Sequence, residues 1–280
     1  MKKEIGSKFI REICIAGPCI DVTMKYSMRG STKKRQEKRN PSSEAVMKNN
    51  DRIAKKRLTR LMNANFYPGD LHCVLTYAGN PPSVEEARKE IEKFRRRMAR
   101  EYAKQGKEFK WIEVTEYKNS RIHHHMLLSY IDDTIIQKQW KAGRARFAPL
   151  DRTRNYKGLA EYFIKETTKT MREPEARTKQ RWSASRNLTR PIVKREIIDA
   201  REMHQKPRAF KGYEIDMDTI TRFTHPFTGI EHLEYMMTST DPVPRIKQWR
   251  KGEPIKRDET IRRAADIQIT MDALDGWFLV

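Results

Sequence analysis

The chain has 280 residues, of which 59 are lysine or arginine and 37 are aspartate or glutamate, so its formal net charge is +22. A positive charge of this size predicts a polyanionic partner, nucleic acid above all. Hydrophobic residues make up 37% of the chain and gather in periodic blocks, which excludes a wholly disordered chain and favours a folded domain with charged extensions.

The cysteines and the start of the chain bear on its compartment. Cys14, Cys19 and Cys73 form neither a CxxC pair nor a disulfide framework, which favours a reducing cytoplasm. Arg11 and Glu12 interrupt the apolar stretch near the start, and no run approaches the ~20 apolar residues that cross a bilayer. We therefore expect an unexported protein with no membrane partner.

The first 66 residues predict two short strands and a basic helix. Residues 9–27 fit two strands around a turn at Gly17, and a helix begins after Ser43. Residues 33–60 contain eleven lysines and arginines against three acids. Such a charge run fits a helix that contacts DNA and equally a helix that is merely solvated.

The next segment predicts a strand, a long helix and a hairpin. The strand covers about residues 71–77, and Ser83 with Glu86 forms a capping box for a helix that runs to about residue 105. Residues 109–130 then fit a hairpin with its turn at 118–120. Alternation along its second strand places His123 and His125 on one face and His124 on the other, which we take as the core face.

Two imidazoles at i and i+2 of one strand can share a metal ion and lack only a third ligand. Glu116, at the end of the preceding strand, is placed to supply it. Glu113 has the opposite parity, His72 on the first strand is a weaker candidate, and a contribution from His124 stays open. The alternative is that these histidines are partly buried polar residues on a sheet face.

Residues 156–169 predict an amphipathic helix with a polar tyrosine. One arc of this helix is apolar and predicted to be buried: Tyr156, Leu159, Ala160, Phe163 and Ile164. Tyr162 and Lys165, at i and i+3, project together from the opposite side. A hydroxyl nucleophile, an ammonium group, metal ligands and a basic chain are the parts needed to transfer a DNA phosphoryl group to tyrosine. Lys165 would lower the pKa of the phenol, position it or neutralise developing charge.

Three segments resemble, in order, the motifs of HUH endonucleases, specifically the rolling-circle replication initiators of plasmids, phages and integrated elements. They are "CVLTY" (73–77), "EYKNSRIHHH" (116–125) and "YFIK" (162–165). The resemblance covers about residues 67–170. It assigns metal binding to Glu116, His123 and His125, and it makes Tyr162 the nucleophile with Lys165 as its partner. His124 departs from the family pattern, in which the middle position is usually apolar. Because Tyr156 lies on the apolar arc, we expect a single nucleophile.

The resemblance implies an α+β fold with a central antiparallel sheet and flanking helices, the helix at 83–105 on one face and the metal site with the tyrosine helix on the other. It implies an enzyme that nicks single-stranded or hairpin origin DNA with Mg²⁺ or Mn²⁺, leaving a 5′-phosphotyrosine and a free 3′-hydroxyl. No Walker A loop occurs, so a helicase and a DNA polymerase of a bacterial host cell are expected partners.

Three segments are expected along the chain. Residues 1–66 would contact DNA, residues 67–240 would form the catalytic domain with a basic extension, and residues 241–280 form a tail of open role. Strands within 211–239 would extend the central sheet or pair with the N-terminal strands. Residues 172–211 contain twelve lysines and arginines against five acids and are predicted to contact phosphates.

Three alternatives stay open. A transposase or a conjugative relaxase would use the same chemistry on a different task. A non-enzymatic nucleic-acid-binding protein would use none of it, so Tyr162→Phe would leave its activity intact. A structural zinc protein is disfavoured because no cysteines are paired at ligand spacing.

Overall fold

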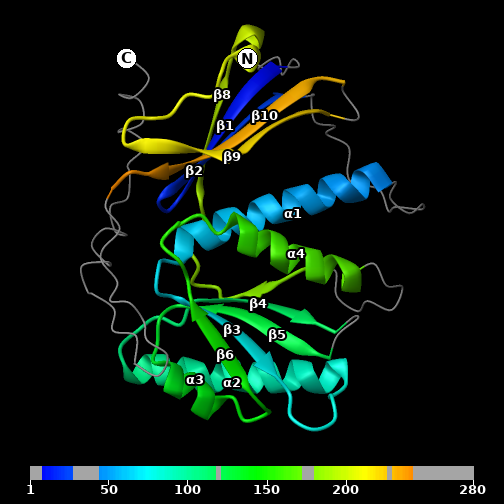
Figure 1. Cartoon of the computed structure of the whole chain (residues 1–280), viewed down its shortest axis with the longest axis vertical. Coiled ribbons are helices and arrows are strands. Elements are labelled where there is room, and N and C mark those ends of the chain that lie inside the picture. Colours follow the sequence, from blue (N-terminus) through cyan, green and yellow to red (C-terminus); the bar gives the residue numbers. More distant parts are fainter. Residues whose placement is uncertain (1–7, 28–43, 118–120, 172–179, 226–228, 242–280) are drawn as a thin grey trace, which may run out of the picture.

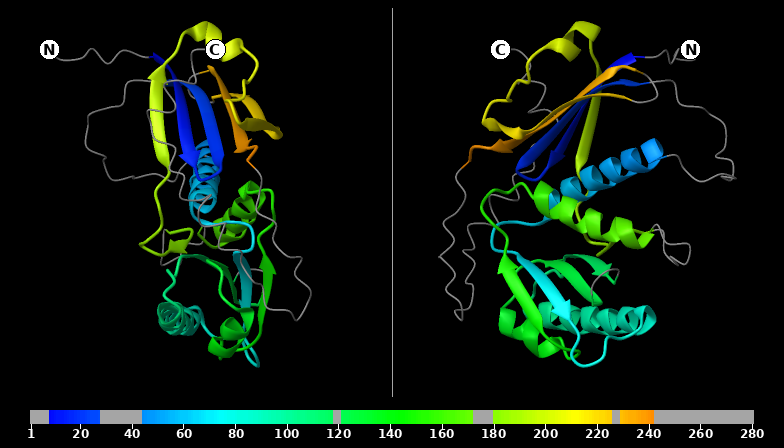
Figure 2. Two further views of the ribbon diagram at one scale, coloured as in Figure 1. Left: turned by 90° about the vertical axis from the view of Figure 1, so that its left-hand side faces the viewer. Right: turned by 45° about the vertical axis from the view of Figure 1, so that its right-hand side comes forward.

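The computed structural model describes residues 8–27, 44–117, 121–171, 180–225 and 229–241. These residues form two five-stranded antiparallel sheets and four α-helices, which confirms the predicted α+β class. Figure 1 shows the two sheets separated by α1 (Glu44–Asn65) and α4 (Lys157–Met171). The turned views in Figure 2 show the same order of layers, with α2 (Val84–Lys104) and α3 (Asp133–Gln139) beyond the second sheet.

Sheet B carries the predicted motifs and has the strand order β6-β3-β5-β4-β7. Its strands are β3 (Leu71–Thr76), β4 (Trp111–Glu116), β5 (His123–Leu128), β6 (Ala145–Pro149) and β7 (Ser183–Ala184). Helix α2 begins at the predicted capping box, in which the Ser83 side chain accepts from the backbone N–H of Glu86. The β4–β5 hairpin is present as predicted, although its turn at 118–120 lies outside the described residues.

Both faces of sheet B are covered, as the resemblance implied, and each face has a core of its own. Leu128 packs with Phe94 of α2, as predicted for the core face. Leu127, on the opposite face, is equally buried and packs with Leu58 of α1 and Phe163 of α4. The face that carries His123 and His125 is therefore a second core, because the distant helix α1 covers it together with α4.

Sheet A has the strand order β8-β1-β2-β10-β9 and was not predicted as a separate sheet. Its strands are β1 (Lys8–Ala16), β2 (Cys19–Ser27), β8 (Ile192–Ile197), β9 (Tyr213–Thr224) and β10 (Glu231–Ser239). Residues 211–239 were expected either to extend the central sheet or to pair with the N-terminal strands. The pairing of β10 with β2 shows that they pair with the N-terminal strands. Sheet A thus joins strands from both sides of the boundary expected at residue 66, and its apolar face has a core of its own around Ile13, Val22 and Met237.

A layer of ion pairs joins sheet A to helix α1. Arg60 lies 2.9 Å from a carboxylate oxygen of Glu12 and 3.1 Å from one of Asp21. Lys56 lies 3.2 Å from Asp21 and 3.1 Å from Glu234. Part of the basic run at 33–60 therefore neutralises buried acids of the chain itself. DNA contact by residues 1–66 stays a prediction, as does the role of the tail, of which residues 242–280 lie outside the described residues.

Candidate metal centre and tyrosine

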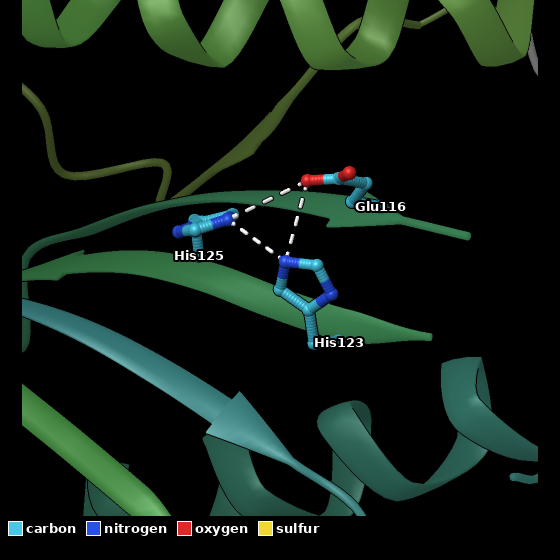
Figure 3. A group of neighbouring side chains, drawn as sticks. All are labelled: Glu116, His123 and His125. Atoms are coloured by element: carbon cyan, nitrogen blue, oxygen red, sulfur yellow. Dashed lines mark hydrogen bonds and ion pairs between the residues drawn. The ribbon is translucent and has the colours of Figure 1, made fainter. Parts of the chain in front are cut away.

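Glu116, His123 and His125 converge on the α4 face of sheet B (Figure 3). Glu116 and His123 lie directly opposite each other in the β4–β5 pair, and His125 follows on the same face. Nε2 of His123 is 3.1 Å from Nε2 of His125 and 3.3 Å from a carboxylate oxygen of Glu116, which lies 3.8 Å from Nε2 of His125. The structure thus brings together the three predicted ligands, with all ligand atoms within 4.8 Å of one another.

The three side chains fit a divalent metal ion. Two imidazoles and one carboxylate are a mixed nitrogen and oxygen donor set, and three ligands leave positions open for a substrate. Burial, with repulsion from His72 and His123, lowers the pKa of His125 to about 3, so this imidazole is neutral, as a metal ligand must be. Nδ1 of His123 is 2.8 Å from the carbonyl oxygen of Arg121, which leaves Nε2 to face the other ligands.

Tyr162 reaches this group from helix α4. Its hydroxyl oxygen lies 3.2 Å from Nε2 of His125, and its side chain is 41% exposed. Lys165, less than one turn further along, is also exposed, whereas the predicted apolar arc is buried around Ala160, Phe163 and Ile164. Tyr156 is only 4% exposed and packs in that core, as predicted. Tyr162 is therefore the accessible tyrosine of the two.

His72 lies behind His125 and outside the ligand group. Its Nε2 is 3.2 Å from Nδ1 of His125, the nitrogen that faces away from Glu116 and His123, and the two rings stack with centroids 5.4 Å apart. Burial lowers the pKa of His72 to about 4. A neutral imidazole in this place can accept a hydrogen bond from the Nδ1–H of His125 and so orient that ring, the usual role of a residue that supports a metal ligand. The sequence suggested His72 only as a weaker ligand.

His124 and Glu113 lie on the opposite face of the sheet, toward α2. His124 is completely buried; its Nε2 is 2.7 Å from the hydroxyl of Tyr77 and its Nδ1 is 2.8 Å from that of Thr115. Glu113 forms an ion pair of 3.0 Å with Arg95. Neither side chain joins the metal-ligand group. Sequence reasoning missed the two hydroxyl partners of His124, although Tyr77 ends one predicted strand and Thr115 lies within another.

Together, the fold and the site define an α+β protein with a His-His-Glu group beside an accessible tyrosine. Residues 70–171 match the model of a family of replication-associated proteins, and this segment contains all five predicted site residues. The match is consistent with a rolling-circle replication initiator. Neither a curated protein nor a solved structure is significantly similar to the chain. Among the described residues, no helix is long and apolar enough to cross a membrane.

Proposed function

We propose that this protein is a replication initiator of the HUH type, which nicks single-stranded origin DNA through Tyr162. The observation that carries the proposal is the 3.2 Å separation between the Tyr162 hydroxyl and Nε2 of His125 within the Glu116–His123–His125 group. The family match over residues 70–171 favours replication over transposition or conjugative transfer, which would use the same chemistry.

In the proposed reaction, the Tyr162 oxygen attacks the scissile phosphorus in line. A bond forms between that oxygen and phosphorus while the bond from phosphorus to the 3′ oxygen breaks, and the DNA 5′ end becomes a phosphotyrosine. The phenol loses its proton to water, and the departing 3′ oxygen takes one up to become a hydroxyl. This end would be extended by a DNA polymerase of the bacterial host, with a host helicase separating the strands.

The residues of the site have separate tasks in this proposal. Glu116, His123 and His125 would hold Mg²⁺ or Mn²⁺, which when bound polarises the phosphate and withdraws charge from its nonbridging oxygens. Lys165, exposed on the same side of α4 as Tyr162, would stabilise negative charge on the phenol oxygen. Because the apolar side of α4 is buried against sheet B, the helix would hold the Tyr162 hydroxyl close to the metal ligands. The tyrosine would then need little movement before it attacks the phosphorus.

The test is formation of a covalent complex. The protein is incubated with Mn²⁺ or Mg²⁺ and with labelled single-stranded or hairpin oligonucleotides that cover candidate origin sequences, and denaturing electrophoresis detects an adduct. We expect an adduct with the wild type and with Tyr117→Phe, a nearby tyrosine that is 37% exposed, and none with Tyr162→Phe. An adduct that persists in Tyr162→Phe assigns the nucleophile elsewhere. No adduct from the wild type with either metal would favour a non-enzymatic binding protein.

A further inference from the structure

Two arginines stand at the edge of sheet B in register with the metal-ligand group. Arg146 of β6 is opposite Val74 of β3, and Val74 is opposite His125 of β5. Arg144, just before β6, exchanges two backbone hydrogen bonds with Thr76, of 2.9 and 3.1 Å, and Thr76 is opposite His123. Directly opposite residues share a face of a sheet, so both arginines project toward the side of the metal ligands.

Burial along β6 supports this orientation independently. Ala145 and Phe147, which alternate with the arginines, pack into the core on the α2 side of sheet B. Arg144 and Arg146 are exposed, and neither forms an ion pair with another residue of the described ranges. Two guanidinium groups therefore stand exposed on the face of the metal ligands, with no acidic partner among the described residues.

The side chains between the arginines and the histidines are only partly buried. Over β4 and β5 the face is closed by α1 and α4, where Val114 and Leu127 are buried. Over β3 the corresponding side chains, Val74 and Thr76, stay partly exposed. Figure 3 shows β3 and β6 beside β5, on the side away from β4. The partly exposed side chains of β3 therefore lie between the two arginines and the metal-ligand group.

Gly143 fixes the position of Arg144. A Cβ atom at this residue would lie 2.2 Å from the carbonyl oxygen of Thr76 and 2.6 Å from the backbone nitrogen of Ala78. The indole N–H of Trp140 donates to the same Thr76 oxygen at 2.9 Å. The turn before β6 is thus locked against the end of β3, and no residue larger than glycine fits there without displacing the edge strand.

We propose that Arg144 and Arg146 bind backbone phosphates of the nucleic-acid strand that is cut at the metal-ligand group. This inference rests on the proposed function and adds how the substrate is held. From β5 to β6 the backbones are two strand spacings apart, about 10 Å, so the arginines would contact phosphates close to the scissile one, not that phosphate itself. A guanidinium group matches a phosphate through two parallel hydrogen bonds. Such contacts set the position of the strand without reading its bases.

The experiment measures binding in the absence of cleavage. In a Tyr162→Phe background, the Kd for a fluorescent single-stranded oligonucleotide is determined over a range of salt concentrations. We expect Arg144→Gln/Arg146→Gln to reduce the slope of log K against log salt by about 1.4, or about 0.7 for each lost contact, and to weaken binding at least about tenfold at 0.1 M salt. The matched control is Arg88→Gln/Arg100→Gln, which removes the same charge from exposed positions of α2 on the other face of the sheet.

A second measurement locates the contact on the DNA. Replacing single phosphates by neutral methylphosphonates should weaken binding by the parent protein at one or two adjacent positions and leave binding by the double variant unchanged there. If the double variant has the slope and Kd of the control pair, the arginine site is refuted. Adduct formation by the wild type is measured separately. A failure of the proposed nicking gives no adduct, whereas a failure of the arginine site gives unchanged binding in the double variant.

Discussion

The phenol oxygen of Tyr162 lies 3.2 Å from Nε2 of His125, the nitrogen that also faces His123 and Glu116. This contact joins helix α4 to strand β5 at the proposed site of DNA cleavage. Phe163, the next residue of the helix, is fully buried and packs on the rings of both His72 and His125, with centroids 5.6 and 5.7 Å away. Packing of Phe163 therefore sets the height at which Tyr162 meets the ligand group.

Replacing Lys165 by methionine tests whether its charge acts in the chemical step. We expect Lys165→Met to form the adduct about 100-fold more slowly, because charge on the phenol oxygen loses a nearby cation. DNA affinity should change at most a few-fold, since one exposed charge is lost. Lys157→Met, in the first turn of the same helix, is the matched control. An unchanged single-turnover rate would remove Lys165 from the mechanism.

Loss of a ligand should abolish the effect of metal on stability. For the wild type, Mn²⁺ at 100 times its Kd should raise the free energy of unfolding by about 2.7 kcal/mol. In Glu116→Gln and His123→Gln we expect this gain to disappear at the same concentration, because each removes one of three ligands. His204→Gln, whose side chain is 77% exposed, should behave as the wild type. Equal stabilisation of all variants by Mn²⁺ would place the metal elsewhere.

His72 is predicted to orient His125 and not to bind the metal. His72→Phe keeps an aromatic ring between His125 and Phe163 but removes the acceptor 3.2 Å from Nδ1 of His125. We expect the Kd for Mn²⁺, measured by calorimetry, to rise about 10- to 100-fold. His72→Gln, which retains a hydrogen-bonding group, should recover part of the affinity. Wild-type affinity in His72→Phe would reduce the role of His72 to packing.

His124 should matter for stability and not for metal binding, because it faces α2. His124→Leu leaves the hydroxyls of Tyr77 and Thr115 without their shared partner in a buried site, which should cost about 1–3 kcal/mol of the free energy of unfolding. Tyr77→Phe removes one of these hydroxyls. In a double-mutant cycle measured by urea unfolding, the combined loss should be smaller than the sum of the two. Strict additivity would show that the two side chains do not interact.

The ion pairs between sheet A and α1 predict a loss of stability in acid. Burial alone raises the pKa of Glu12, but Arg195, Lys25 and Arg60 outweigh it and lower the pKa to about 2. A lowered folded-state pKa stabilises the protein above the unfolded value of 4.5, and this contribution is lost as the pH falls from there toward about 2.

Glu12→Gln should therefore unfold at lower urea concentrations at pH 7, with a loss of about 2 kcal/mol once solvent screening of the exposed Arg195 is allowed for. Its stability should also decline less than that of the wild type between pH 5 and 2. Asp218→Asn, at an exposed position of β9, should keep the pH profile of the wild type. Parallel profiles for Glu12→Gln and the wild type would contradict the assignment.

Local periodicity alone determined which side chains share a face. Alternation along one strand separated His123 and His125 from His124, and the helical period separated Tyr162 from the buried Tyr156; the structure has both separations. Such patterns involve residues a few positions apart, whose relative directions follow from backbone geometry. The capping box at Ser83 could be predicted from the sequence because its two residues are also only three positions apart.

Only the tertiary structure decided which elements meet. Four relationships join segments far apart in the chain. Strand β10 pairs with β2, and α1 covers a second core. His72 lies behind His125, and Arg146 is in register with His125 through Val74. Each depends on strand pairing and burial summed over many distant residues, and no spacing within one segment encodes it. The sequence therefore determined the chemical groups and their faces, and the packing of α4 on sheet B determined that they meet.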